Sequence, residues 1–220
     1  ALESGVVMVL DRTNAGAGFC SGVVVARNAV LTAAHCLAEP KNMRIHYRDE
    51  TGAPILIDVA ATAVHPLFRA DAPKTRERSI DLALIRTATP LPDRFHPVTL
   101  DSGTNLIVGA RIRVAGFGVT REGAGDTAGK LRLGSLEVRA PISSILLWAD
   151  DPGHAGTGAC MGDSGGPVFA ETSDVVIAVT DWAAGAGRRR CGELTQAALV
   201  APQRAWIEKI LAQWGADSPT

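Results

Sequence analysis

The 220-residue chain lacks the features that mark membrane proteins and nucleic-acid-binding proteins. No apolar run approaches the roughly 18 residues that a membrane-spanning helix needs. The 22 Lys and Arg residues nearly balance the 23 Asp and Glu residues, which leaves a net charge of −1. Because the basic residues form no stripe or block, we expect neither nucleic acid nor a membrane as a partner.

A signal peptide and close cysteine pairs are also missing. Residues Ala1–Gly5 show no basic region followed by an apolar stretch, which leaves room for a leader that has already been removed. The cysteines number only four and allow three pairings, and no two lie two to four residues apart as zinc ligands usually do. We therefore expect disulfides and no metal. Two disulfides form in an oxidising compartment, so the predicted location is secreted or periplasmic.

What the chain does contain is a series of short β-branched or alternating runs separated by turn residues, a pattern typical of all-β proteins. The first set comprises Val6–Leu10, Gly22–Thr32, Arg44–Tyr47, Ile55–Val64 and Leu82–Arg86. The second set comprises Ile112–Ala115, Leu133–Arg139, Val168–Ala170, Val175–Trp182 and Gln196–Val200. The Pro-rich stretch Thr89–Asp93 separates them and predicts two domains, residues 1–93 and 94–220. A helix is predicted over about 202–214, with its apolar face in the core.

The most informative segment is Gly162-Asp163-Ser164-Gly165-Gly166-Pro167. Glycines on both sides of a serine allow a tight turn that exposes the hydroxyl and leaves backbone N–H groups free to bind an anion. Taken alone, the same residues could form an ordinary surface turn. The segment becomes a candidate for a nucleophilic serine only if the chain also supplies a base.

Two other segments supply the missing groups. His35 follows an apolar run in Thr32-Ala33-Ala34-His35-Cys36, and Asp81 opens the apolar run Asp81–Ile85. A serine hydroxyl needs an adjacent base, and a histidine base needs a carboxylate to hold its tautomer. His35, Asp81 and Ser164 offer one candidate for each role, in the chain order His, Asp, Ser.

Together these motifs resemble those of trypsin-like serine proteases with the chymotrypsin fold. The matching segments run in the family's order from residue 19 to the C-terminal helix. They are Phe19–Gly22, Thr32–Cys36, Asp81–Ile85, Ala115–Gly118, Gly162–Pro167 and Val179–Trp182.

The resemblance implies two antiparallel β-barrels packed face to face, followed by a C-terminal α-helix. His35 and Asp81 would lie in the first barrel and Ser164 in the second, with an oxyanion hole formed by the N–H groups of Gly162 and Ser164. It further implies the disulfides Cys20–Cys36 and Cys160–Cys191. We expect a secreted endopeptidase that needs no cofactor, acts on proteins or peptides as a monomer and meets protein inhibitors. Two bridges and an Ala-, Gly- and Arg-rich composition favour a bacterial source.

The resemblance also predicts a pocket for the residue before the scissile bond. Its base and walls would be Gly158, Ala159, Trp182, Ala183 and Thr195. The base has no carboxylate and side chains narrow the walls, so small or medium apolar residues such as Ala, Val or Leu are the expected substrates. The run Arg188–Arg190 precedes Cys191 and is expected as a solvated loop at the cleft rim.

Two departures from the family pattern stand out. The chain has no Ile-Val-Gly-Gly segment, whose freed amine pairs in many relatives with the aspartate before the nucleophile, here Asp163. Either the mature N-terminus lies upstream of Ala1, or Asp163 has another partner. Asp181 stands where the family usually has serine, and a second buried carboxylate near Asp81 would raise the pKa of one of the two.

Two alternatives to a peptidase keep the same fold. One is a catalytically silent binding or adhesion protein, whose usual sign, the loss of a triad residue or pocket glycine, is absent. The other is an esterase, since the same triad also acylates with esters. Cleavage of a peptide library separates the peptidase from both.

Overall fold

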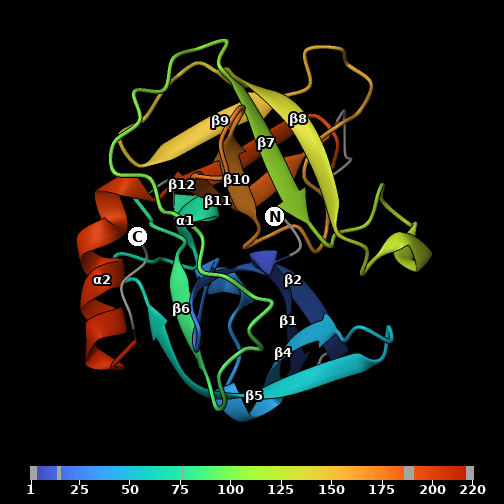
Figure 1. Cartoon of the computed structure of the whole chain (residues 1–220). Helices are drawn as coiled ribbons and strands as arrows, with labels where there is room; N and C mark the ends of the chain where they lie inside the picture. The colour runs from blue at the N-terminus through green and yellow to red at the C-terminus, as the bar shows by residue number, and fades with distance from the viewer. Residues whose placement is uncertain (1–3, 14–15, 76, 186–190, 217–220) are drawn as a thin grey trace.

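The computed structural model describes residues 4–13, 16–75, 77–185 and 191–216. Within these ranges the chain forms two closed antiparallel barrels of six strands each (Figure 1). The first barrel, ordered β1-β2-β3-β6-β5-β4, contains β1 (Val6–Thr13), β2 (Gly16–Ala26), β3 (Ala29–Thr32), β4 (Met43–Arg48), β5 (Pro54–Val64) and β6 (Ala83–Thr87). The second, ordered β10-β11-β12-β9-β8-β7, contains β7 (Arg111–Gly116), β8 (Arg132–Arg139), β9 (Leu146–Asp150), β10 (Pro167–Ala170), β11 (Val176–Ala184) and β12 (Leu194–Leu199).

Helices are short apart from one at the C-terminal end. The α-helices are α1 (Ala72–Thr75) and α2 (Arg204–Gln213), and the 3₁₀ turns are η2 (Ala34–Cys36), η3 (Pro40–Asn42), η4 (Gly125–Thr127) and η5 (Ala201–Gln203). Ile207 and Leu211 of α2 are fully buried, and the rings of Trp206 and His65 meet edge to face at 4.8 Å. Trp206, and Trp214 just past the end of α2, are partly buried and pack against buried apolar side chains, as the apolar periodicity predicted. No helix within the described ranges has the length and apolarity to cross a membrane.

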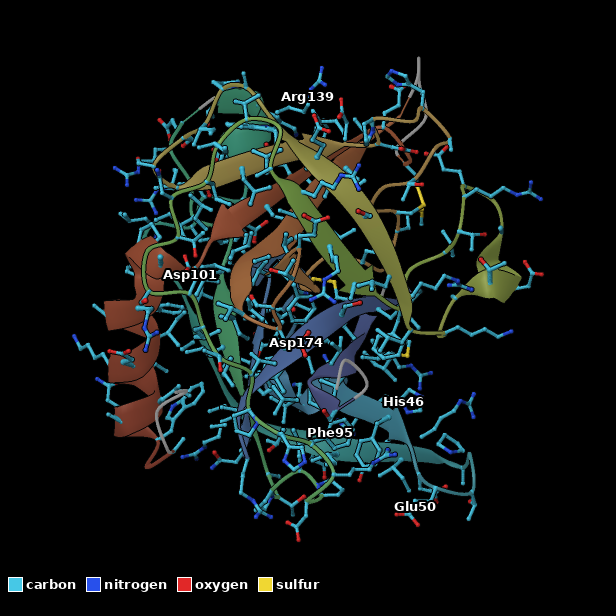
Figure 2. All side chains as sticks on the ribbon, turned by 45° about the horizontal axis from the view of Figure 1, so that its top comes forward. His46, Glu50, Phe95, Asp101, Arg139 and Asp174 are labelled. Atoms are coloured by element: carbon cyan, nitrogen blue, oxygen red, sulfur yellow. A yellow bond between two sulfur atoms is a disulfide. The ribbon has the colours of Figure 1, made fainter. Side chains whose placement is uncertain are left out.

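Three clusters of buried side chains explain why the barrels pack together. One fills the first barrel, where Phe95 (Figure 2) packs at 5.0 Å from the ring of Tyr47, and another fills the second. The third lies between the barrels and takes side chains from both as well as from α2. In β2, Val24 faces the barrel interior while Val23 and Val25 face the third cluster. A strand buried on both faces reads as a continuous apolar run, which accounts for the sequence of this segment.

The predicted architecture of two barrels and a C-terminal helix is confirmed, with differences in detail. The predicted strand Gly22–Thr32 is two strands, because the chain turns at residues 27–28 between β2 and β3. Strand β9 was not predicted. The α-helix begins at Arg204, since Pro202 lies in the preceding turn η5. The domain boundary after residue 93 falls in the connection between β6 and β7 and stays a prediction.

Candidate active site

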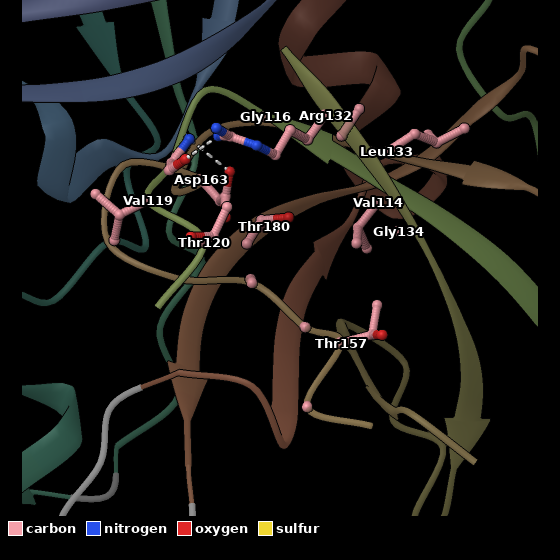
Figure 3. A pocket seen from close by; sticks show the side chains of 15 residues that line it. Val114, Gly116, Val119, Thr120, Arg132, Leu133, Gly134, Thr157, Asp163 and Thr180 are labelled. Atoms are coloured by element: carbon pink, nitrogen blue, oxygen red, sulfur yellow. Dashed lines mark hydrogen bonds between the residues drawn. The ribbon is translucent and has the colours of Figure 1, made fainter. Parts of the chain in front are cut away.

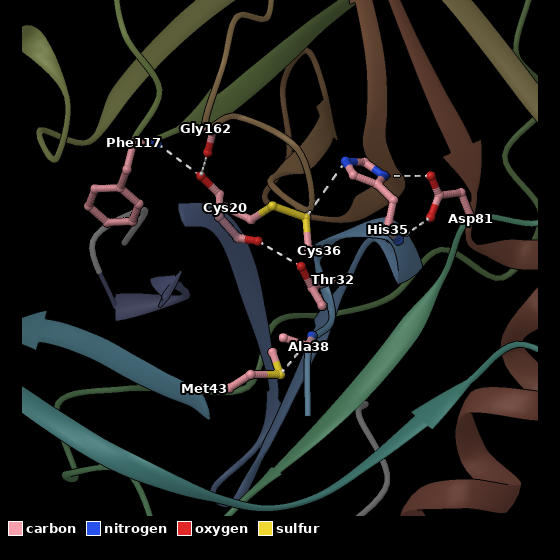
Figure 4. Close-up of a disulfide and its surroundings, with 10 residues drawn as sticks. Cys20, Thr32, His35, Cys36, Ala38, Met43, Asp81, Phe117 and Gly162 are labelled. Atoms are coloured by element: carbon pink, nitrogen blue, oxygen red, sulfur yellow. Dashed lines mark hydrogen bonds and ion pairs between the residues drawn. A yellow bond between two sulfur atoms is a disulfide. The ribbon is translucent and has the colours of Figure 1, made fainter. Parts of the chain in front are cut away.

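His35 and Asp81 are brought together by strand pairing. Strands β3 and β6 pair with Thr32 opposite Ala83, so the turn η2 that follows β3 lies beside the residues that precede β6. His35 Nδ1 lies 2.6 Å from Asp81 Oδ2, and the backbone N–H of His35 donates to Oδ1 at 2.9 Å (Figure 4). A carboxylate only accepts, so the neutral ring carries its proton on Nδ1 and leaves Nε2 as an acceptor.

The turn that carries Ser164 is fixed by backbone hydrogen bonds. Gly166 N–H donates to the Asp163 carbonyl at 2.9 Å, and Gly165 N–H donates to Thr180 of β11 at 2.7 Å. A further bond crosses between the barrels, since Ser21 N–H of β2 donates to the carbonyl of Ser164 at 2.8 Å. The first barrel thus holds the backbone of the proposed nucleophile directly.

Ser21 also bridges the two barrels through its side chain. Its hydroxyl donates to the Gly162 carbonyl at 2.9 Å and accepts the N–H of Phe117 at 2.9 Å. This bond fixes the Gly162 peptide with its carbonyl toward the first barrel. Within the described residues, the N–H groups of Gly162 and Ser164 have no hydrogen-bond partner. Two unpaired donors beside a serine can hold a developing oxyanion.

Two glycines of the turn are required by close approach. Gly162 has a φ of +97°, and a Cβ there would collide with the Phe19 ring. Gly165 has a φ of +81°, and a Cβ there would collide with Thr32 and the Ser21 carbonyl. The same built Cβ would lie 3.1 Å from the backbone nitrogen of Ala33, two residues before His35. The serine turn is therefore packed against the segment that carries the histidine.

No hydrogen bond joins Ser164 to His35 among the described residues. His35 Nε2 lies 3.8 Å from the Cys36 sulfur. Nucleophile-to-base hydrogen bonds are often loose before substrate binds. The structure thus joins two of the three predicted triad side chains directly and places the backbone of the third next to them.

The electrostatic surroundings favour the protonated form of His35. Its side chain is 40% exposed. Partial removal from water lowers the pKa of His35, but the Asp81 hydrogen bond and the negative charges of Asp81 and Asp181 outweigh this and raise the pKa above its usual value. The raised pKa means that the surroundings of His35 stabilise the imidazolium that forms when the ring takes a proton.

Asp163 lies behind the serine turn and lines a cavity of about 170 Å³ (Figure 3). Gly118 N–H donates to its Oδ1 at 2.8 Å and Cys160 N–H to its Oδ2 at 2.9 Å. Burial raises the pKa of Asp163, while these two bonds and the nearby charge of Arg132 oppose the rise. The Asp163 carboxylate therefore has hydrogen-bond donors within the chain, the N–H groups of Gly118 and Cys160. The sequence had not pointed to Arg132 as a neighbouring positive charge.

Asp181, in β11, is the second buried carboxyl group near the site. It is 7% exposed, and its Oδ2 accepts a hydrogen bond from Gln196 Nε2 at 3.2 Å. Burial, followed by the charge of Asp81, raises the pKa of Asp181 to about 7. The sequence-based expectation of a perturbed carboxyl beside Asp81 thus falls on Asp181.

The five predicted pocket residues lie on neighbouring segments. Ala183 pairs with Thr195 across β11 and β12, and the fully buried Thr195 accepts the N–H of Ala159 at 2.9 Å. Gly158 lies close to Gly192, and Trp182 is 50% exposed. The predicted rim residues Arg188–Arg190 lie outside the described residues.

Both disulfides form, Cys20–Cys36 beside His35 and Cys160–Cys191 beside the predicted pocket. Within the described ranges, one group of side chains has the spacing of a metal site: Cys20, His35 and Cys36. The two sulfurs form a disulfide with each other, and His35 Nδ1 is hydrogen-bonded to Asp81. These residues are therefore poor metal ligands.

Comparison with known proteins identifies the family. The Trypsin family model matches residues 3–207. The chain belongs to the Trypsin family. Human Granzyme M is 29% identical to this trypsin-family chain over 219 residues, covering 89% of the chain and 80% of that protein.

Solved structures show the same fold. Neuropsin, a serine protease expressed in the limbic system of mouse brain, superposes on this trypsin-family chain with a TM-score of 0.74 at 22% identity, covering 96% of each chain. An inactivated protease paralogue of the scabies mite superposes with a TM-score of 0.71 at 22% identity, also covering 96% of each. The chain therefore has the chymotrypsin fold of trypsin-like serine proteases. The fold alone does not establish activity, because an inactivated protein shares it. These relatives are animal proteins and give no support to a bacterial source.

Proposed function

We propose that this chain is a serine endopeptidase in which Ser164, His35 and Asp81 act as a catalytic triad. The observation that carries the proposal is the His35–Asp81 pair, with Nδ1 and Oδ2 2.6 Å apart, beside a serine turn whose two N–H donors are unpaired among the described residues. A base oriented by a carboxylate and free donors near a serine are the parts that acyl transfer needs.

The reaction follows from these groups. Ser164 Oγ attacks the carbonyl carbon of the scissile peptide while His35 Nε2 accepts its proton. The N–H groups of Gly162 and Ser164 hold the oxyanion of the tetrahedral intermediate. The His35 imidazolium, stabilised by Asp81, then protonates the leaving amine. Water hydrolyses the acyl-enzyme by the same steps, and Ser164 regains its proton.

The predicted substrates are protein or peptide chains with Ala, Val or Leu before the scissile bond. Gly158 and Ala159 offer no charge, and the hydroxyl oxygen of the buried Thr195 already accepts the N–H of Ala159. Such a pocket would bury a charged side chain without a partner, which is unfavourable by several kcal/mol. A panel of chromogenic peptides that differ only in this residue tests the preference. Fastest turnover after Arg would contradict it.

Membership of the Trypsin family and the two disulfides support secretion of this protein. Secretion is tested by expressing the chain with a leader and measuring the protein and its disulfides in the medium. The bacterial source, the monomeric state and the inhibitors stay predictions.

Labelling with a serine-directed phosphonate tests the proposed function. Wild-type protein should be labelled at Ser164, Ser164→Ala should not be labelled, and Ser144→Ala should be labelled like wild type because Ser144 lies in an exposed loop. Folding of each variant is checked by circular dichroism. Absence of labelling in folded wild type would favour the silent binding protein, and labelling with cleavage of esters but not peptides would favour the esterase.

A further inference from the structure

Asp181 occupies a β-bulge in β11 and lies close enough to the proposed catalytic pair to interact with the charges of Asp81 and His35. Thr180 pairs with Ala197 and Trp182 with Gln196, so Asp181 is an extra residue without a partner in the ladder. Bulges near active sites re-aim side chains in this way. Thr180 lines the cavity that holds Asp163, whereas Asp181 acts on Asp81 and His35.

A hydrogen-bond chain fixes which atom of Gln196 meets Asp181. Trp148 Nε1 lies 3.1 Å from Gln196 Oε1, and an indole N–H can only donate. The amide oxygen of Gln196 must therefore face Trp148, and its NH₂ group must face Asp181 Oδ2. The other oxygen, Oδ1, is buried and has no hydrogen-bond partner within the described part of the chain.

The charged groups that face Asp181 are Asp81, from the segment before β6, and His35, from η2. Strands β9 and β12 contribute only the uncharged Trp148 and Gln196. No Lys or Arg forms an ion pair with Asp181 among the described residues. An ionised Asp181 would thus be a buried carboxylate beside a second carboxylate, with one amide donor.

We propose that Asp181 is a positioning residue: at slightly acid pH it carries a proton and donates it from Oδ1 to the Asp81 carboxylate. The proton lets the buried Asp181 Oδ1 form a hydrogen bond, and it leaves one negative charge on the two carboxyl groups of Asp81 and Asp181 instead of two. Asp81 keeps His35 in place through its two existing bonds, and the third donor limits its movement. This inference rests on the proposed function, because it assigns Asp181 a role toward the His35–Asp81 pair.

The pKa of Asp181, raised to about 7 by burial and the charge of Asp81, agrees with a neutral acid. Above that pH, Asp181 loses the donated proton, so the species that combines a neutral His35 with a protonated Asp181 becomes less populated. Wild-type kcat/KM should therefore fall again on the alkaline side of a maximum. The two groups titrate as a coupled pair.

Asp181→Asn tests the proposal, because the amide keeps a donor toward Asp81 and an acceptor for Gln196 but cannot ionise. Near neutral pH its kcat/KM should lie within about threefold of wild type, while Asp181→Ala, without the donor, should lose roughly tenfold or more in kcat. Asp181→Asn should lose the alkaline fall, and its rising limb should move to lower pH. Asp174→Asn is the control, since Asp174 (Figure 2) is 58% exposed and paired with Arg113 at 3.1 Å; its profile should match wild type.

Difference infrared spectra test the proton without catalysis. Wild type and Asp174→Asn should show the carbonyl stretch of a neutral carboxylic acid at pH 6, with loss of the band as the pH rises, and Asp181→Asn should lack it. Absence of the band in wild type, or superimposable pH profiles of wild type and Asp181→Asn, would overturn the proposal. A band present in protein that the phosphonate does not label would refute the proposed function and the positioning role, but would uphold the assigned proton.

Discussion

Replacing Asp181 by Asn should stabilise the fold, and the gain should depend on pH. The carboxyl of an unfolded chain has a pKa of about 3.9, whereas burial and the neighbouring Asp81 raise the pKa of Asp181 in the fold to about 7. The folded state therefore binds more protons than the unfolded state between these values. The stability that this extra proton contributes is fully present below the pKa of the unfolded chain. It is lost as the pH rises through the pKa of the folded state.

The size of the effect follows from the shift. About three pKa units at 1.36 kcal/mol each give about 4 kcal/mol in the free energy of unfolding. Asn has nearly the same shape and does not titrate. The advantage of Asp181→Asn over wild type should thus grow by about 4 kcal/mol between about pH 4 and about pH 8.

Urea unfolding at a series of pH values measures this difference, with the disulfides intact. Tryptophan fluorescence and circular dichroism should give coincident transitions, which validates a two-state free energy. Asp174→Asn serves as the control, and its difference from wild type should stay small because the Asp174 side chain is 58% exposed. An advantage of Asp181→Asn that is the same at every pH would refute the reasoning, since it would show that Asp181 does not bind an extra proton on folding.

Three further predictions concern the site. Wild-type kcat/KM should rise with pH through an apparent pKa above about 6.5, because the hydrogen bond and the charge of Asp81 outweigh the partial desolvation of His35, and the charge of Asp181 adds to them as that group ionises; a rising limb below that value would contradict it. Gly165→Ala should destabilise the fold by about 2–4 kcal/mol in urea unfolding, since its positive φ and the contact with Thr32 leave no room for a Cβ, and unchanged unfolding would refute this. Removing the Cys20–Cys36 bridge, which spans 16 residues, should cost about 3 kcal/mol in the same assay, and an unchanged midpoint would contradict the estimate.

The sequence predicted the strands because turn residues interrupt its apolar runs, and the resemblance to trypsin-like proteases implied their arrangement in two barrels. It failed where burial on both faces removes alternation. The run from Gly22 to Thr32 shows no alternation on either side of the turn between β2 and β3, because Ser21–Ala26 and Ala29–Thr32 are buried at every position. The five-residue run of β9 follows Ser143 and Ser144 and cannot be distinguished from a loop by its pattern.

The candidate site could be predicted as residues but not as geometry. Three separate motifs named His35, Asp81 and Ser164, and the pairing of β3 with β6 explains the contact of the first two. The direction of the Asp181 side chain depends on a bulge, and a bulge inserts a residue without any fixed sequence signature. The roles of Ser21 and Gln196 depend on contacts between segments far apart in the chain, which one sequence does not reveal.

The bridge made by Ser21 has a consequence for the exchange of whole barrels between relatives. Its backbone N–H and its hydroxyl hold the carbonyls of Ser164 and Gly162, so the shape of the serine turn is partly specified by a strand of the other barrel. A chimaera that joins the second barrel to a foreign first barrel can keep every triad residue and both cores. It will still lack the hydrogen bond to the Gly162 carbonyl unless the incoming strand offers a donor at the place of the Ser21 hydroxyl. Exchange of barrels in this fold therefore depends on the residue at the position of Ser21 as well as on the fit between the apolar surfaces of the two barrels.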